Sequence, residues 1–509
     1  MDSQLMTPNG INMVLSEFLD RYRKTLRRLF TERTDIDKLS LNRGIPPYML
    51  RQIMDCNPLS VFIPEEYGGR GAHVYEGLSM LETTSYESLP LSLMMGINGA
   101  LFLQPVANYG QDIVKQPIFD RFLKKKNLGG LMITEPDYGS DALRMQTSFV
   151  ETEKGYHIEG LKHWAGLTGW ADFWLITARS KDEEGELGRD ISFFIHDTNN
   201  GGIEVEEYYK NLGLYMLPYG RNRIDIDVPA ENRLEPRSTG VKMMLDILHR
   251  SRLQFPGMGM GFLRRMLDEA VDHCKNRFVG GKSLFKYDQV KDRLARLQSS
   301  FTACSAMCAF TSENAGMDKD VSKFDVSANA IKTVTTDLMH DAAQSLVQLF
   351  GAKGYRLDSI AGRSLVDSRP FQIFEGSNDI LYQQISESIL KKMRRFKERN
   401  LYKFLSEYKL TEHAADYFKD VLSFEVDVKM AQRKLVDLGK IIGRMISLEF
   451  TIKLGEKGFN SDLIANSIKV MRSDITELMC SFKGGKEASV IEDYRDNSSW
   501  VDYLSLQAK

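Results

Sequence analysis

The sequence has few cysteines and almost no net charge, and each shortage excludes a class of protein. The five cysteines of the 509-residue chain are scattered, odd in number and without CxxC spacing, which argues against a disulfide framework and a zinc site. The 67 Lys and Arg residues nearly balance the 69 Asp and Glu residues, so we expect no general attraction for nucleic acid or anionic lipid. These features predict a protein of a reducing compartment, the cytoplasm, with no metal site.

Long apolar runs are also scarce. Residues 1–34 lack the uninterrupted apolar stretch of a signal peptide, so nothing marks the chain for export, and no run approaches the roughly 18 apolar residues that a membrane span needs. The apolar content of 42% and the charged content of 27% are ordinary for globular proteins. At a prior of roughly 150 residues per domain, the length predicts two to four packed units.

Changes of hydrophobic period divide the chain into four units. Residues 1–130 repeat apolar side chains at helical spacing, which predicts an α-helical N-terminal domain. Residues 131–236 hold short β-rich runs between turn residues and predict a β-barrel or sandwich. Helical patterns return over 237–395, as a bundle, and over 396–509, as an extra helical domain. This order of segregated elements predicts an α+β fold and argues against a doubly wound nucleotide-binding fold.

Shorter patterns refine these units. Strands are expected at 156–158, 173–178, 191–195 and 224–228, and long helices at 241–277 and 289–317. A packing seam in the last unit follows heptad-like steps through Val428, Ala431, Leu435, Leu438, Ile442 and Met445. The basic run 391–399 is expected to be a solvated linker, although DNA or acidic lipid could also bind it.

Two segments carry the residues best suited to chemistry. The turn at 136–140, together with the hydroxyls of Thr134 and Ser140, can present donors to a polar cofactor edge or a pyrophosphate. In the segment FEGSND at 374–379, Glu375 stands beside Gly376 near the start of an expected helix. From local sequence alone, Glu375 could be a catalytic base or an exposed acid stabilised by the helix dipole, and the turn could be an ordinary surface turn.

Five segments in chain order resemble signature segments of the acyl-CoA dehydrogenase family. They are IPEEYGG at 63–69, LMITEPDYGSD at 131–141, GLKHW at 160–164, FGAKGY at 350–355 and FEGSND at 374–379. The resemblance implies an N-terminal helical domain, a middle β-barrel and a C-terminal four-helix bundle, with the extra helical domain appended. It also implies an FAD cofactor, fatty acid metabolism and a homodimer or homotetramer.

The resemblance assigns roles to individual residues. Three of the cofactor contacts, Arg277, Gln348 and Gly351, are implied to come from a neighbouring subunit. The others implied are Leu131, Ile133, Thr134, Gly139, Ser140, Trp164, Gly166, Ser377 and Asp379. The implied substrate contacts are Ser140, Arg252, Phe374 and Gly376. Arg252 could instead be a solvated helix charge.

Glu375 is implied to be the base that removes the α-proton of an acyl thioester, while the flavin accepts the β-hydrogen as hydride, converting acyl-CoA to trans-2-enoyl-CoA. Such a reaction needs a poised carboxylate and donors on the carbonyl oxygen. Some family members place the base before an arginine on an earlier helix, but here Ser251 precedes Arg252, so no rival carboxylate occupies that position.

Several alternatives stay open. The sequence after Trp164 reads Ala165-Gly166, a Trp-x-Gly pattern closer to acyl-CoA oxidases, and the missing side chain could open space for oxygen near the flavin. Electrons could therefore pass to O2 rather than to an electron-transfer flavoprotein. The acyl group could ride on an acyl-carrier protein instead of coenzyme A. A flavin-containing DNA-binding relative is a further alternative, but no nucleic acid partner is expected.

Overall fold

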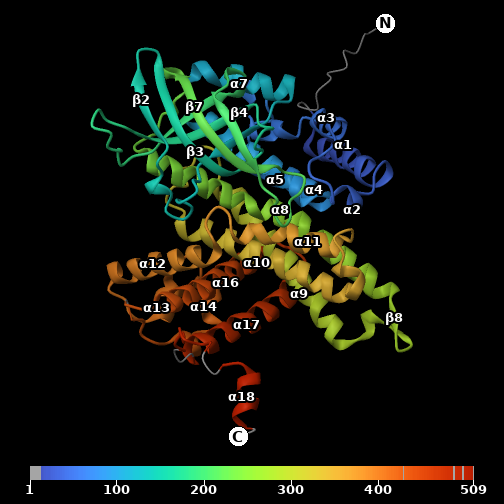
Figure 1. Cartoon of the computed structure of the whole chain (residues 1–509). Coiled ribbons are helices and arrows are strands. Elements are labelled where there is room, and N and C mark those ends of the chain that lie inside the picture. Colours follow the sequence, from blue (N-terminus) through green and yellow to red (C-terminus); the bar gives the residue numbers. More distant parts are fainter. Residues whose placement is uncertain (1–12, 428, 485–487, 496–497, 508–509) are drawn as a thin grey trace.

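The computed structural model describes residues 13–427, 429–484, 488–495 and 498–507. Figure 1 shows a helical unit and a sheet unit side by side at the top, long helices crossing beneath both, and a second helical layer at the bottom. The top helices are α1 Leu15–Arg27, α2 Ile36–Leu39, α3 Pro47–Met54, α4 Val74–Glu87, α5 Leu89–Asn98, α6 Gln104–Tyr109 and α7 Asp112–Lys125.

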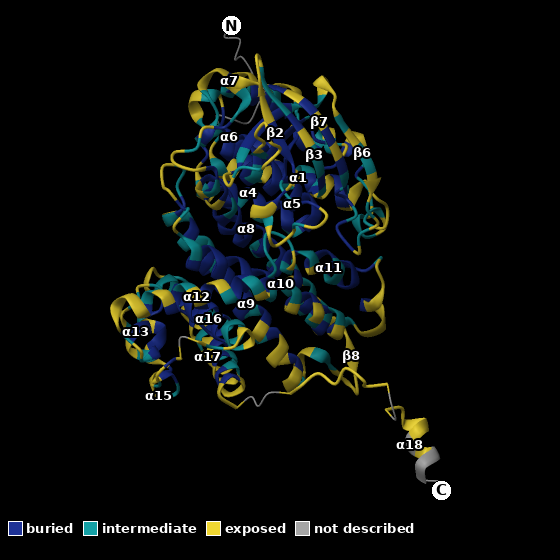
Figure 2. Ribbon diagram, turned by 60° about the vertical axis from the view of Figure 1, so that its left-hand side comes forward, coloured by how far each residue is buried: buried dark blue, intermediate teal, exposed yellow. Residues whose placement is uncertain are grey.

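The sheet unit is one curled sheet. Its strands are β1 Gly129–Met132, β2 Ser148–Thr152, β3 Gly155–Gly166, β4 Phe173–Ser180, β5 Ser192–Asp197, β6 Ile203–Tyr208 and β7 Tyr219–Pro229. They are paired in the order β1-β4-β2-β3-β7-β6, and β5 pairs with β4. The pairs β1–β4 and β2–β4 are parallel and the other pairs are antiparallel. A continuous core runs through the strands and the long helices below them (Figure 2).

The bundle beneath the sheet contains α8 Gly240–Asn276, α9 Asp288–Asn314, α10 Asp325–Phe350, α11 Ile360–Ser368 and α12 Asn378–Phe396, with the hairpin of β8 Phe278–Val279 and β9 Lys282–Ser283. The N-terminus of α8 is capped twice: Thr239 Oγ1 accepts from Lys242 N at 3.2 Å, and the carboxylate of Asp190 accepts from Gly240 N at 2.8 Å. Because Asp190 precedes β5, this cap ties the sheet to the bundle.

The last helical layer, which we call the extension, comprises α13 Leu401–Glu407, α14 Glu412–Asp416, α15 Lys419–Leu422, α16 Gln432–Glu456, α17 Ser461–Gly484 and α18 Trp500–Gln507. It packs against the bundle through α16 and α17, whereas α18 projects away from it (Figure 1). Four members of the expected seam lie in α16, and three of them, Leu438, Ile442 and Met445, are fully buried. Ala431 is the N-cap of α16, and Val428 lies outside the described residues.

The expected strands are confirmed, except that residue 191 precedes β5. Another expectation is wrong: most of the basic run 391–399 is not a linker, because α12 continues to Phe396. Among the described residues, one helical run, Leu89–Tyr109, is long and apolar enough to cross a membrane. Its most apolar window is 94% buried inside the structure, as in the core helix of a globular domain.

Candidate active site

Glu375 lies in a tight turn between the short helical segment Arg369–Gln372 and α12. Ser251 Oγ, on α8, donates to Glu375 Oε1 at 2.8 Å. The second oxygen, Oε2, is covered from solvent and has no hydrogen-bond partner among the described residues. Burial raises the pKa of the Glu375 carboxyl, while the bond from Ser251 and the charges of Arg252 and Lys332 oppose that rise. The site therefore holds a desolvated carboxylate with a free lone pair, as a general base requires.

The backbone of this turn is strained. Glu375 has a φ of +54° and Gly376 a φ of +93°, and left-handed backbone at a residue with a Cβ costs about 1–2 kcal/mol. Two cations hold the turn by its carbonyls. Arg252 donates to Glu375 O from Nε at 3.1 Å and from Nη2 at 2.8 Å. Lys332 Nζ donates to Gly376 O at 2.9 Å. These bonds fix the direction in which the Glu375 side chain points.

Arg252 is not a solvated helix charge. Its side chain is buried, and its Nη1 donates to Asn329 Oδ1 on α10 at 2.8 Å. Lys332 was not singled out from the sequence. A signal was present, since Lys332 is the only charged residue between Asp325 and Asp337. Burial lowers its pKa to about 7, and the nearby Glu375 opposes that effect. In the sequence, Ser251 was notable only because it is not a carboxylate that could act as a rival base. In the structure it donates to the carboxylate of Glu375.

Two aromatic side chains bring the sheet unit to this turn. Trp164 sits at a bulge of β3 with a φ of +54°, and its side chain is 52% exposed. The Tyr219 ring, at the start of β7, lies 6.3 Å from the Trp164 ring between centroids. Burial raises the pKa of the Tyr219 hydroxyl, and the charge of Glu375 raises it further. The Tyr219 hydroxyl therefore lies within the electrostatic influence of the Glu375 carboxylate.

Gly166 does not leave open space for oxygen, so that expectation is wrong. Gly166 pairs with Tyr219 across β3 and β7. A Cβ at this position would lie 2.7 Å from Ile97 Cδ1 and 3.4 Å from Tyr219 Cε1. The missing side chain is thus replaced by neighbours on α5 and β7, and Gly166 does not decide between a dehydrogenase and an oxidase.

The turn after β1 is anchored from within the sheet. Lys162 Nζ donates to Glu135 Oε1 at 2.9 Å and to Ile133 O at 3.2 Å. Beyond this anchor the turn faces outward: Gly139 and Ser140 are exposed, and a Cβ added at Gly139 would meet nothing within 4 Å. Ile133 and Thr134 are half-buried, whereas the Leu131 side chain is buried in β1.

The remaining site residues fall into two groups. Phe374 is half-buried against Phe255 and Phe371, with ring centroids 6.1 and 4.9 Å away. Ser377 is the N-cap of α12, and the Asp379 side chain is exposed, 3.7 Å from Lys440.

The second group lies at the other end of the bundle. His273 near the end of α8 stacks on Phe350 at the end of α10, with ring centroids 4.3 Å apart, which brings Arg277, Gln348 and Gly351 to one end. The hairpin that follows Arg277 projects away from the sheet in Figure 1.

These features fit a flavin. The exposed indole of Trp164 offers a flat apolar face, and the outward turn at 133–140 offers hydroxyls and uncovered backbone to a polar edge. Both lie on the sheet unit, and the Tyr219 hydroxyl of that unit is influenced by the charge of Glu375.

Comparison with known proteins identifies the family of the chain. Three family models match in chain order: the acyl-CoA dehydrogenase N-terminal domain over residues 16–126, the middle domain over 130–226 and the C-terminal domain over 238–390. The chain belongs to the acyl-CoA dehydrogenase family. It is 25% identical to the mitochondrial very long-chain specific acyl-CoA dehydrogenase of Macaca fascicularis over 380 residues, 74% of this chain. That match spans only 58% of the relative's length.

Two solved structures place this acyl-CoA dehydrogenase family member among known folds. An acyl-CoA dehydrogenase from Bacillus anthracis, complexed with FAD, has a TM-score of 0.76 at 16% identity and covers 98% of this chain and 92% of its own. A prolyl acyl carrier protein oxidase has a TM-score of 0.67 at 17% identity and covers 74% of this chain and 98% of its own. The first likeness includes the extension, which lies beyond the family models.

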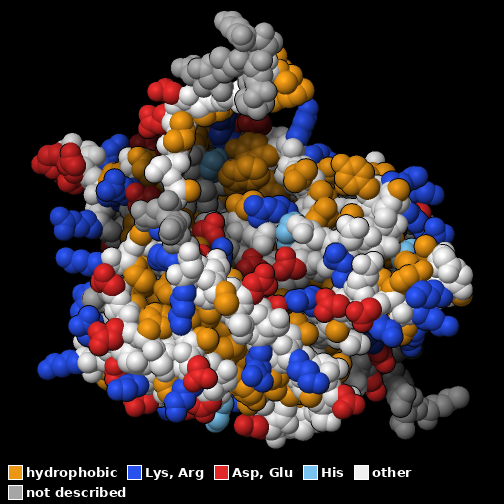
Figure 3. All heavy atoms as spheres, turned by 90° about the horizontal axis from the view of Figure 1, so that it is seen from below, with side chains coloured by type: hydrophobic (Ala, Val, Ile, Leu, Met, Phe, Trp, Pro, Cys, Tyr) orange, Lys and Arg blue, Asp and Glu red, His pale blue; other side chains and the backbone are white. Residues whose placement is uncertain are grey.

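The extension face carries charges of both signs. Figure 3, which views the molecule from below, shows Lys and Arg side chains interspersed with Asp and Glu over most of that face. A nucleic-acid surface would gather positive charge in one patch or stripe. This face therefore offers no such surface.

Proposed function

We propose that the protein is an FAD-dependent dehydrogenase that introduces a trans α,β double bond into an acyl thioester, with Glu375 as the α-proton base. One observation carries the proposal: Glu375 Oε2 is covered, lacks a hydrogen-bond partner among the described residues and belongs to a carboxyl whose pKa is raised by burial. An exposed helix-start acid would have neither property. Proton removal then uses a lone pair that no other group occupies.

The backbone of the same turn supplies a second element. The Glu375 N–H donates to no described residue, so it is available to the thioester carbonyl oxygen, on which charge develops as the α-proton leaves. Phe374 and its aromatic neighbours would line the acyl channel. Gly376 and Arg252 keep the turn in position beneath the substrate.

The flavin would be held on the sheet side by Trp164 and the turn at 133–140, with Gly166, Ser377 and Asp379 nearby. When bound, FAD supplies an acceptor for the β-hydrogen as hydride, which no side chain can provide. The acyl-CoA dehydrogenase from Bacillus anthracis is complexed with FAD, which supports the same cofactor here.

A neighbouring copy would complete the cofactor site. The tip residues Phe278 and Val279 are 64% and 46% exposed, an apolar arm that suits burial against a second subunit. We therefore propose a homodimer or homotetramer in which Arg277, Gln348 and Gly351 contact the flavin of the adjacent subunit.

For the acyl carrier and the electron acceptor we propose a first and a second candidate. Acyl-CoA and an electron-transfer flavoprotein are favoured, since most relatives in the comparisons are named acyl-CoA dehydrogenases. An oxidase acting on an acyl-carrier protein is the second candidate, favoured by the likeness to a prolyl acyl carrier protein oxidase.

Fatty acid metabolism and a cytoplasmic location complete the proposal. The location is supported by five free thiols.

The deciding experiment is anaerobic flavin bleaching by straight-chain acyl-CoAs, from butyryl to palmitoyl, and by the matching acyl-carrier proteins. Glu375→Gln should bind FAD as the wild type does and bleach at least 10²-fold more slowly, the loss typical of removing a general base. Glu387→Gln, an exposed acid on α12, is the matched control and should bleach normally. Normal bleaching by Glu375→Gln would refute the base. Hydrogen peroxide formed in aerobic turnover without an added acceptor would identify an oxidase.

A further inference from the structure

The extension packs tightly against the bundle beside the catalytic turn. A Cβ at Gly439 on α16 would lie 2.0 Å from Tyr382 O on α12, and one at Gly443 would lie 3.3 Å from Tyr382 Cε1. Ser386 Oγ, one turn further along α12, donates to Leu435 O at 2.6 Å. Two glycines thus let α16 lie directly against the first turns of α12, which begins three residues after Glu375.

Tyr382 connects this contact to a buried carboxylate. Its hydroxyl donates to Asp337 Oδ2 on α10 at 2.6 Å. The other oxygen, Oδ1, accepts from Asn378 Nδ2 at 2.7 Å and from Gln372 Nε2 at 2.8 Å. Asp337 therefore joins α10 and α12 to the segment just before the catalytic turn.

Asn378 carries the network on to the turn itself. Its Oδ1 accepts from Lys332 Nζ at 2.9 Å, and the same Nζ donates to Gly376 O at 2.9 Å. An unbroken chain of hydrogen bonds runs from Tyr382 through Asp337, Asn378 and Lys332 to the residue that follows the base. In a buried network each member orients the next.

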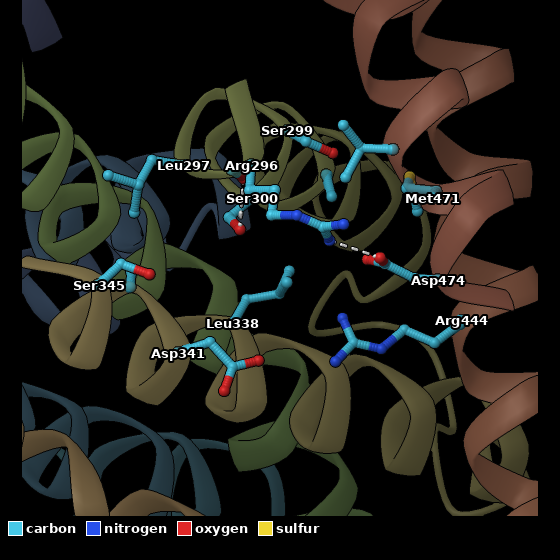
Figure 4. Close-up of a pocket in the computed structure, with 13 residues that line it drawn as sticks. Arg296, Leu297, Ser299, Ser300, Leu338, Asp341, Ser345, Arg444, Met471 and Asp474 are labelled. Atoms are coloured by element: carbon cyan, nitrogen blue, oxygen red, sulfur yellow. Dashed lines mark hydrogen bonds and ion pairs between the residues drawn. The ribbon is translucent and has the colours of Figure 1, made fainter. Parts of the chain in front are cut away.

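Beside this contact, α9 and α10 of the bundle and α16 and α17 of the extension line a cavity of roughly 110 Å³. Figure 4 shows Arg444 of α16 reaching toward Asp341 of α10, while Arg296 of α9 bonds Asp474 of α17 at 2.6 Å. Around this cavity the extension meets α10 through charged side chains, and it packs closely on either side, at Tyr382 of α12 and where Phe450 of α16 stacks on Phe310 of α9.

We propose that α16 of the extension positions the catalytic turn, and that Tyr382 is the positioning residue through which it acts. The inference rests on the proposed role of Glu375 as the base. Gly439 sets the distance between α16 and Tyr382, and the hydrogen-bond chain transmits the position of Tyr382 to the Gly376 carbonyl. The extension then contributes to the reaction without touching substrate or flavin.

Two variants of the full-length, FAD-loaded protein test this role. Tyr382→Phe keeps the ring and removes only the bond to Asp337. Gly439→Ala forces α16 away from α12, because the new methyl group meets the Tyr382 carbonyl. Gly455→Ala is the matched control: it makes the same substitution in the same helix but faces Ile464 of α17.

The assay is exchange of the acyl-CoA α-hydrogen in D2O, followed by mass spectrometry, with a titration of FAD binding and a thermal melt for each variant. Tyr382→Phe and Gly439→Ala should lower the maximal exchange rate about tenfold or more, since small displacements of a catalytic group are costly. The half-saturating acyl-CoA concentration and the FAD dissociation constant should stay within about twofold. Gly455→Ala should exchange at the wild-type rate, even if it melts at a lower temperature.

Wild-type exchange by Tyr382→Phe would overturn the proposal, as would an equal loss in Gly455→Ala and Gly439→Ala, which would reveal a purely structural role. Glu375→Gln separates the two levels of inference. If it loses exchange while Tyr382→Phe keeps it, only the positioning role is wrong. If Glu375→Gln exchanges normally, the base assignment is wrong and the positioning role fails with it.

Discussion

Replacing the buried Lys162 by Met should strongly lower the free energy of unfolding of the sheet unit. The Lys162 side chain is fully buried and donates three hydrogen bonds: to Glu135 Oε1 at 2.9 Å, to Thr177 Oγ1 at 3.1 Å and to Ile133 O at 3.2 Å. Glu135 is itself buried and keeps its bonds from Gln146 N and Thr147 N. The variant therefore leaves a buried carboxylate without its cation.

Breaking a buried ion pair by removing one partner costs about 3–5 kcal/mol. The two retained backbone bonds to Glu135 place the expected loss near the lower end, at about 3 kcal/mol. Replacing both partners, as Lys162→Met with Glu135→Gln, should recover at least half of that loss because no charge remains buried.

Tryptophan fluorescence suits the measurement, since Trp164, Trp170 and Trp174 lie in the sheet unit and only Trp500 lies elsewhere. Urea unfolding would be compared for the wild type, both single variants and the double variant. FAD affinity should fall in Lys162→Met as well, because Ile133 and Glu135 belong to the turn that would face the flavin. A loss below about 1 kcal/mol, or a double variant no more stable than Lys162→Met, would refute the role of the ion pair.

Two further predictions concern the base and the arm. Burial raises the folded-state pKa of Glu375 above its ordinary value of 4.5, so the stability that this group contributes is fully present below pH 4.5 and is lost as the pH rises through the folded pKa. Urea unfolding at pH 5 and pH 8 should thus show Glu375→Gln gaining stability relative to wild type at the higher pH; a difference independent of pH would contradict the raised pKa. For the arm, Phe278→Asp should shift sedimentation toward smaller species and weaken FAD binding, whereas Val490→Asp, at an exposed residue of the C-terminal tail, should change neither.

The α-β-α order of the fold was predictable because hydrophobic period changes from helical to alternating and back along the chain. The strands at 156–158 and 224–228 are such a case, while their direct pairing in the structure was not predicted. The end of α12 was not predictable from charge alone: the basic run looks like a linker, but Leu390 and Met393 on its buried side continue the helix against the core.

Residues of the candidate site could be proposed from the sequence where they belong to a motif, but not where residues far apart in the chain come together only in the fold. Glu375 and Arg252 stand out by their place in a motif. Lys332 and Tyr382 do not, because a lysine in a helix is usually solvated and a tyrosine is usually core, and only the fold brings them near the turn. The space beside Gly166 was misjudged for the same reason, since Ile97 lies 69 residues away in sequence (166 minus 97).

The arrangement of charge around Glu375 resolves a conflict between two requirements of the base that we propose it to be. The carboxylate must be desolvated to have a free lone pair, yet desolvation raises its pKa and favours the protonated form that cannot act. Arg252 and Lys332 oppose that rise by their charge, but their hydrogen bonds go to the carbonyl oxygens of Glu375 and Gly376, not to the carboxylate. Because the cations bind the backbone, they stabilise the anion through space and leave Oε2 unoccupied. The left-handed turn makes this possible, since its two carbonyls accept from Arg252 and Lys332 while its carboxylate accepts from Ser251.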